Sequence, residues 1–247
     1  MFEAHPRFIE PASSAAVWRY MDLARFISLA ATSALYFTRS DLMADRWEGA
    51  FGEANERDAR EFYGGDYQSA FQTRRLEREH ARRMVHLNCW HVAEYESAAM
   101  WETYQREGRG VAIRTTWGHL KESIVDSWQV FGGLVEYADY RTTQIDESNL
   151  YAAFLVKRLS FEYEREARLV FNSATLGLPG VDVKQTRAVG ALVSPPGYSI
   201  EIDLASLRGT VFVAPAEPAW VLQSVRSLVA SLEAPFEVEQ SALSALP

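Results

Sequence analysis

Residues 160–171 read SFEYEREARLVF, and this stretch has two structural interpretations. As a strand, it places three glutamates and Arg168 on one face, opposite a face of mostly large apolar side chains. As a helix in its first half, it makes Glu162 and Glu166 neighbours at a spacing of four, with arginines within reach. Three carboxylates on one strand face repel one another, so the strand interpretation requires something that compensates them.

Short apolar runs on both sides of this stretch predict further strands. The clearest is GVAIRTT, where Val111, Ile113 and Thr115 share one face. The expected strands are VWRYMD (17–22), ALYFTRS (34–40), VHLNCWHV (85–92), GVAIRTT (110–116), GLVEYADY (133–140), AVGALVS (188–194), IEIDL (200–204), TVFVAP (210–215) and FEVEQ (236–240).

Helices are expected between these strands. Asp22 is placed to cap a helix whose buried face includes Phe26 and Ile27. Ser97 is placed to cap another helix, and Gly108 to end it. The remaining helical segments are expected within 55–84, near 147–159 and at 218–231.

Strands and helices are intermixed at irregular spacing, without repeated βαβ units. This order favours an α+β fold, a single domain around a mixed, largely antiparallel sheet with flanking helices. Pro6 and Pro11 disfavour regular structure near the N-terminus. Residues 1–16 are therefore expected to form an arm, and residues 17–247 the domain.

Composition narrows the class of protein. The chain has 247 residues, 48% of them hydrophobic, and a formal net charge of −8, which gives no strong signal for nucleic-acid binding. Its single cysteine, Cys89, excludes an intramolecular disulfide framework. No apolar run approaches the length of a membrane span, and the N-terminus lacks the regions of a signal peptide. The sequence predicts a cytoplasmic protein without membrane contact.

A first group of candidate site residues follows the strand expected at 34–40. The segment DLMADRWEG (41–49) places Asp45 and Glu48 directly after the strand end, where loops often hold sites. The structural alternative is that Asp45 caps a turn and that Glu48 pairs with an arginine. Both alternatives stay open from the sequence.

A second group lies in ESAAMWETY (96–104). Met100, Trp101 and Tyr104 recur at helical spacing and predict a core stripe. Ser97 is an expected N-cap, although a hydroxyl at a helix start can also contact an anionic ligand.

A third group is Glu164 and Glu166. On one strand face, such a pair can orient a sugar hydroxyl and stabilise positive charge at an anomeric carbon. Salt-bridged surface residues are the alternative. The chain has no P-loop, GxGxxG, HExxH or GxSxG motif, and its histidines lack metal-site spacing, so no metal is expected.

Several segments together resemble a bacterial family known as domain of unknown function 2971. They are VWRYMD, LYFTRSDLMADRWEG, CWH, ESAAMWETY, GRGVAIRTT, VEYADY, KRLSFEYEREARLVF and VFVAPAEPAWVLQSV. The resemblance runs from about Trp18 to the last expected strand. It implies no biochemical activity, and it marks as hallmark polar positions Arg19, Asp45, Glu48, Ser97, Trp101, Tyr104, Glu164, Glu166 and Arg168.

A second resemblance concerns mechanism. The order Arg19, Ser97 and then Glu164 with Glu166 is similar to that of ADP-ribosyltransferases of the arginine–serine–glutamate type. The resemblance implies that Arg19 grips a phosphate of NAD, that Ser97 orders the nicotinamide pocket and that a glutamate stabilises the oxocarbenium-like transition state. The helical context of Ser97 departs from that family, whose serine lies in a strand motif.

Three functional hypotheses follow. The first is an NAD-using ADP-ribosyltransferase-like enzyme in a toxin or phage-defence role, with Glu166 or Glu164 as the catalytic carboxylate and Tyr36 or Trp101 against the nicotinamide. The second is a non-catalytic module that binds a protein or small ligand through exposed tryptophans and arginines. The third is a metal-dependent nuclease built on Asp45, Glu48 and the glutamates near 164. The substrate and the partner are left open by the sequence.

Overall fold

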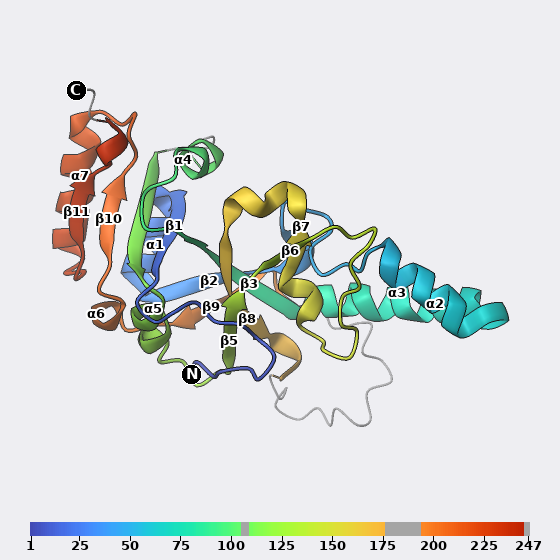
Figure 1. The fold of residues 1–247 in the computed structure, drawn as a ribbon. Helices are drawn as coiled ribbons and strands as arrows, with labels where there is room; N and C mark the ends of the chain where they lie inside the picture. The colour runs from blue at the N-terminus through green and yellow to red at the C-terminus, as the bar shows by residue number, and fades with distance from the viewer. Residues whose placement is uncertain (105–108, 176–193, 245–247) are drawn as a thin grey trace.

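The computed structural model describes residues 1–104, 109–175 and 194–244 (Figure 1). The strands are β1 (Ala16–Asp22), β2 (Ala34–Arg39), β3 (Val85–Val92), β4 (Gly110–Thr116), β5 (Val130–Leu134), β6 (Glu136–Ala138), β7 (Val156–Arg158), β8 (Glu166–Asn172), β9 (Gly197–Glu201), β10 (Thr210–Val213) and β11 (Glu237–Gln240). The α-helices are α1 (Leu23–Thr32), α2 (Glu53–Tyr63), α3 (Tyr67–Met84), α4 (Ala98–Tyr104), α5 (Trp117–Ser123), α6 (Leu204–Leu207) and α7 (Ala219–Ser231). Two 3₁₀ segments matter for the site, η3 (Ala152–Phe154) and η4 (Leu159–Glu164).

Strand β3 lies at the centre of a nine-stranded sheet. One path through the sheet runs β11-β10-β4-β1-β3-β2-β9, and β8 and β5 continue it from the other edge of β3. Every described pairing in this sheet is antiparallel except that of β10 with β11. Strands β6 and β7 form a separate parallel pair. The chain is a single α+β domain around a mixed, mostly antiparallel sheet with flanking helices, which confirms the expected fold class.

One edge of β3 is shared by two strands. β1 pairs with its C-terminal end at His91 and Val92, and β2 pairs with its other end at His86 and Leu87. Between these contacts no strand of the described residues pairs with the backbone of β3 on this edge, so its polar groups need other partners. Arg19 supplies one of them, because its Nη1 donates to the carbonyl of Cys89 at 3.2 Å.

The two faces of the sheet carry separate apolar clusters. On one face, buried residues of β1, β4, β8 and β10 pack with α1, α5 and α7. On the opposite face, Trp18 and Tyr20 pack under α4 with Met100 and Trp101. Farther along this second face, side chains of β3 and β8 pack against η3. Helices α2 and α3 project away from the sheet as a hairpin (Figure 1). No helix of the described chain is long and apolar enough to cross a membrane.

Most of the expected strands and helices are present, and local signals explain their bounds. Asp22 caps α1, accepting from the amide of Arg25 at 2.8 Å, and α7 starts just after Pro218. Ile27, expected on the buried face of α1, is instead 40% exposed. The end of the helix expected at Gly108 and most of the strand expected at 188–194 lie outside the described residues.

Two expected elements are wrong. The helix near 147–159 is a series of turns, followed by η3 and β7. Side chains of Asp146 and Asn149 accept from the amides of Ser148 and Tyr151, which stabilises turns in place of a helix. The single strand at 133–140 is divided between the two sheets, because β5 ends at Leu134 and β6 pairs with β7.

The stretch at 160–171 contains a helical segment in its first half and a strand in its second half. Residues 159–164 form the 3₁₀ segment η4, and β8 begins at Glu166. Arg165 joins them in a left-handed conformation with φ 41°. That conformation is unusual for a residue with a side chain. The strand alternation therefore holds only from Glu166 onward, with Glu166 and Arg168 on one face.

Candidate active site

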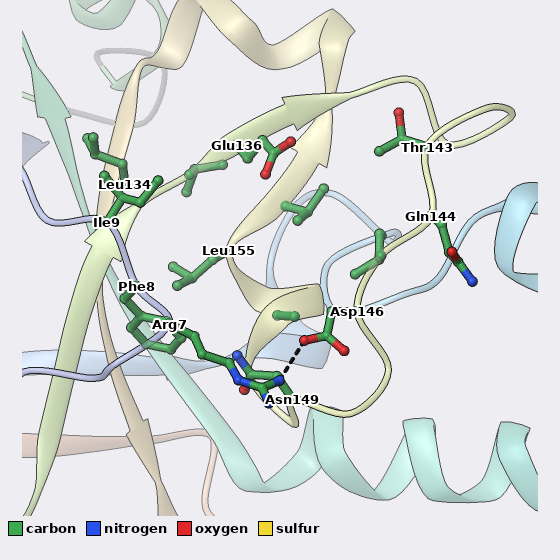
Figure 2. A pocket seen from close by; sticks show the side chains of 14 residues that line it. Arg7, Phe8, Ile9, Leu134, Glu136, Thr143, Gln144, Asp146, Asn149 and Leu155 are labelled. Atoms are coloured by element: carbon green, nitrogen blue, oxygen red, sulfur yellow. Dashed lines mark hydrogen bonds and ion pairs between the residues drawn. The ribbon is translucent and has the colours of Figure 1, made fainter.

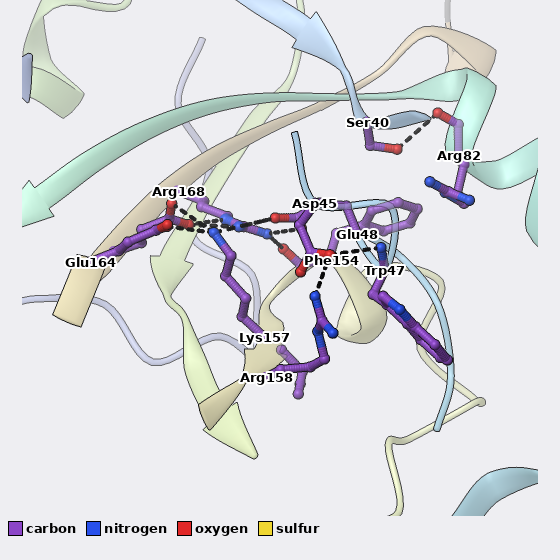
Figure 3. Close-up of polar contacts among 12 residues, drawn as sticks. Ser40, Asp45, Trp47, Glu48, Arg82, Phe154, Lys157, Arg158, Glu164 and Arg168 are labelled. Atoms are coloured by element: carbon purple, nitrogen blue, oxygen red, sulfur yellow. Dashed lines mark hydrogen bonds and ion pairs between the residues drawn. The ribbon is translucent and has the colours of Figure 1, made fainter. Parts of the chain in front are cut away.

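A cluster of buried charges lies beside η3, η4 and the start of β8 (Figure 3). We call it the charge cluster. Its members come from residues 157–168 and from a loop more than a hundred residues earlier: Glu48, Lys157, Glu164, Glu166 and Arg168.

Arg168 is the centre of the charge cluster. Its guanidinium is fully buried and donates from Nη1 and Nη2 to the two oxygens of Glu48, at 2.7 and 2.8 Å. Nε donates to Glu166 Oε2 at 2.6 Å, and Nη1 also donates to the carbonyl of Phe154 at 2.8 Å. A buried charge is tolerated only when its donors are satisfied in this way.

Lys157 completes the charge cluster from strand β7. Its Nζ donates to Glu164, lies 3.4 Å from Glu166 Oε1 and lies 3.6 Å from Glu48 Oε1. Three carboxylates thus face two cations, which leaves one excess negative charge. A proton held between two carboxylates removes that excess.

For this reason, the pKa values of Glu164 and Glu166 differ in opposite directions from that of an ordinary glutamate. Burial, followed by the hydrogen bond and the charge of Glu166, raises the pKa of Glu164 to about 7. Burial alone would raise the pKa of Glu166 too, but the charges of Arg168 and Lys157 lower it to about 2. Near neutral pH, Glu166 is therefore ionised and Glu164 exchanges a proton.

The separated pKa values predict a pH dependence of stability. Because the pKa of Glu164 is about 7 in the folded chain and lower in the unfolded chain, its contribution is complete below about pH 4.5 and is lost as the pH rises through 7. The free energy of unfolding should fall by roughly 1–3 kcal/mol between pH 5 and 8, after allowance for solvent screening. Chemical denaturation across this range measures the slope. The variant Glu164→Gln should lose it, and an equal slope in the variant would contradict the assignment.

The loop after β2 supplies Glu48 and also Asp45. Asp45 Oδ1 accepts from the amide of Trp47 at 3.0 Å and from Arg158 Nη2 at 2.8 Å. Asp45 is thus a turn cap paired with an arginine, and Glu48 is paired with Arg168. Both of these arrangements match the structural alternative from the sequence.

Arg19 lies in the gap between β1 and β2. It contacts the carbonyls of Cys89 and Tyr36, at 3.2 and 3.5 Å, and its guanidinium lies 5.8 Å from the Trp90 ring centroid. Burial lowers its pKa. Within the described part of the chain, no carboxylate forms an ion pair with Arg19. Its charge is therefore available to an anion.

Tyr104 is the last residue of α4, and its ring centroid lies 6.4 Å from that of Tyr20. Burial raises the pKa of its hydroxyl, and the charges of Cys89, Glu166 and Glu164 add to this effect, whereas Arg19 opposes it. Trp18, His91 and Glu166 are paired across three neighbouring strands and therefore share one face of the sheet, whereas Arg19 follows Trp18 in β1 and starts on the opposite face. Among the described residues, no contact joins Arg19 to either glutamate.

The other predicted site residues have different surroundings. Ser97 caps α4, accepting from the amide of Met100 at 3.4 Å, and its own amide donates to the Tyr20 hydroxyl at 2.9 Å. Trp101 is buried and its indole donates to Glu96 at 3.0 Å. Tyr36 is 47% exposed on β2. The structure brings neither Trp101 nor Tyr36 into contact with the charge cluster.

Three residues near the glutamates were missed from the sequence. Lys157 comes directly before Arg158 in a short strand that was expected to be helix. The Tyr137 hydroxyl accepts from the amide of Glu166 at 2.8 Å, and His91 Nδ1 lies 2.6 Å from the carbonyl of Glu164. Tyr137 and His91 are tens of residues from the glutamates in sequence, so only the tertiary structure places them there, whereas Lys157 is within ten residues of both.

Two cavities are lined by polar as well as apolar side chains of the described residues. One of about 480 Å³ is lined by His91, Tyr163 and Arg165 and by the segment before α4, and its lining includes both sequence neighbours of Glu164 but not Glu164 itself. The other, of about 500 Å³, lies between the N-terminal arm and residues 143–156 (Figure 2). Its lining is mostly apolar, with an Arg7–Asp146 ion pair at 2.7 Å. Neither cavity is lined by a member of the charge cluster, and the first comes closer to it in the chain, through Tyr163 and Arg165.

The acidic residues do not form a metal-ligand set. Among the described residues, no group of three or more His, Cys, Asp or Glu side chains is arranged to hold a metal ion. Asp45 and Glu48 are each engaged by an arginine.

Comparison of the chain with protein-family models, curated proteins and solved structures finds no match. The resemblance to domain of unknown function 2971 therefore stays a prediction.

Proposed function

We propose that this protein is an NAD-using enzyme that cleaves the N-glycosidic bond to nicotinamide, in the manner of an ADP-ribosyltransferase, with a role in toxicity or phage defence. The observation that carries the proposal is the pair Glu164 and Glu166, whose pKa values lie near 7 and 2. Pairs of carboxylates separated in this way are typical of sites that cleave glycosidic bonds.

Glu164 is better suited than Glu166 to act on a substrate. The Glu164 side chain keeps 16% of its surface exposed, against 7% for Glu166. Both oxygens of Glu166 face cations, because Arg168 holds one and Lys157 lies near the other. We therefore assign the acid–base role to Glu164 and a positioning role to Glu166.

The proposed reaction balances with water as the acceptor. The bond between the ribose C1′ and the pyridinium nitrogen breaks, and nicotinamide leaves with the bonding electrons as a neutral molecule. The carboxylate of Glu164 stabilises the positive charge on the ribose and takes a proton from the attacking water. The products are nicotinamide, ADP-ribose and a proton; a transferase would replace water by a nucleophile of an acceptor. Arg19, which forms no ion pair with a carboxylate of the described residues, suits the pyrophosphate.

The test measures nicotinamide release from NAD by the purified protein. Because Glu164 acts as the base, the rate should rise with pH to half its maximum near pH 7, and Glu164→Gln should reduce it by about 10²–10⁴-fold. The matched control is Glu162→Gln, an exposed glutamate two residues away in η4, which should leave the rate unchanged. No release by the unmodified protein with water or any acceptor, or equal rates in the two variants, would falsify the proposal.

A binding module is the second candidate, supported by the mostly apolar cavity beside the N-terminal arm. Capture of a ligand by this module should survive the loss of Glu164 and Glu166, whereas the enzymatic function should not. The nuclease hypothesis gains no support from Asp45 and Glu48, since each carboxylate is already engaged by an arginine.

A further inference from the structure

The cavity of about 480 Å³ beside Glu164 has a distinctive set of side chains. Tyr95 and Tyr163 line it and are 84% and 51% exposed, and among the described residues neither ring contacts another aromatic ring. Arg165 and Glu94 also line it and are exposed. Within the described chain, no carboxylate pairs with Arg165. The cavity therefore offers two free aromatic faces, one cation without a carboxylate partner among the described residues, and two carboxylates, of which Glu96 already accepts from Trp101.

Two residues that line the cavity are close to Glu164, one through its backbone carbonyl and one as its neighbour in sequence. His91 lines the cavity and its Nδ1 lies 2.6 Å from the carbonyl of Glu164. A carbonyl only accepts, so Nδ1 carries the proton. Tyr163 is adjacent in sequence to Glu164; burial and then the charge of Glu164 raise the pKa of its hydroxyl. The lining of the cavity thus includes both sequence neighbours of Glu164, although the Glu164 side chain is not part of it.

Arg165 has an unfavourable backbone conformation for a residue with a side chain. Arg165 has φ 41°, a conformation that costs free energy for any residue except glycine. Its carbonyl accepts from the amide of Val92 at 2.8 Å, and its amide donates to the carbonyl of Glu162 at 3.1 Å, which fixes this turn. A glycine would satisfy the backbone better, so the arginine here is a candidate for function.

We propose that this cavity binds the nicotinamide mononucleotide half of the dinucleotide, with the pyridinium ring on the faces of Tyr95 and Tyr163 and the phosphate on Arg165. The assignment rests on the proposed function. Tyrosine faces attract a cationic ring, and Glu94 adds to that attraction. Guanidinium binds phosphate through charge-assisted hydrogen bonds. The ribose C1′ would then lie between ring and phosphate, on the side of Glu164.

The test measures binding of nicotinamide mononucleotide to the Glu164→Gln protein by calorimetry. Adding Arg165→Gly should weaken binding about tenfold or more while leaving the melting temperature equal or higher. The matched control is Arg208→Gly: Arg208 is also an exposed arginine in a left-handed conformation, with φ 46°, but it ends α6 and does not line the cavity. It should not change the affinity. The reduced mononucleotide, whose ring is neutral, should bind about two- to fivefold more weakly than the oxidised form.

The outcomes separate this inference from the proposed function. Absence of binding at millimolar concentration, or equal affinities in the Arg165→Gly and Arg208→Gly proteins, overturns the assignment of the cavity. Binding that depends on Arg165, combined with no release of nicotinamide by the unmodified protein, supports the assignment and rejects the enzymatic function. Release of nicotinamide with an unchanged KM in Arg165→Gly supports the function and rejects the cavity.

Discussion

Replacement of Arg168 by methionine is expected to lower the free energy of unfolding by about 3–5 kcal/mol. Methionine has a similar length, so the loss comes mainly from charge. Without the guanidinium, Glu48 loses both hydrogen bonds that Arg168 donates to it. Among the described residues, Glu166 then keeps Lys157 as its one positive partner. Equilibrium unfolding in urea at pH 7 measures the change.

Two further variants show whether the loss reflects the charge cluster. Arg46→Met removes an exposed arginine from the neighbouring loop and should change stability by less than about 0.5 kcal/mol. The double variant Glu48→Met with Arg168→Met removes one charge of each sign. Its loss in free energy of unfolding should be smaller than the sum of the losses in the two single variants by roughly 1–3 kcal/mol. Strict additivity would show that these two side chains do not stabilise each other.

Replacement of Gly49 by alanine should cost roughly 2–4 kcal/mol, the second-largest effect expected. Gly49 has φ 69°, and an added Cβ would lie 2.2 Å from Cε1 of Phe154. Phe154 is buried in η3, and its carbonyl accepts from Arg168, so the ring has little freedom to move. The substitution would also displace the adjacent Glu48. Thermal or urea unfolding measures the effect.

Gly65→Ala is the matched control for this change. Gly65 lies between α2 and α3, has no left-handed φ, and among the described residues no atom lies within 4 Å of an added Cβ. The variant should match the parent within about 0.5 kcal/mol. If Gly49→Ala were equally well tolerated, the close contact described between Gly49 and the Phe154 ring would be contradicted.

The sequence predicted the fold better than the arrangement of polar residues. Strands such as β3 and β4 have clear apolar patterns, and the cap at Asp22 and the proline before α7 are local signals. These signals depend on neighbours within one turn or one strand. They require no knowledge of the tertiary structure.

The charge cluster could not be predicted in the same way. Glu48 meets Arg168 across 120 residues, so no spacing rule connects them. Lys157 was assigned to a helix because the competing turns at Asp146 and Asn149 were not recognised. The stretch at 160–171 combines a 3₁₀ segment, a left-handed arginine and a strand, and a single periodicity cannot describe it.

The central place of β3 has a consequence during synthesis on the ribosome. β3 is complete at Val92, but β8, which covers its whole second edge, begins only at Glu166. Until then the nascent chain exposes a row of unpaired backbone groups that another chain can extend as a sheet. Asp45 and Glu48 also lack their arginine partners until these are translated, more than a hundred residues later. A shortened chain that ends just before Glu166 would permanently lack both β8 and the arginine partner of Glu48, and it would aggregate.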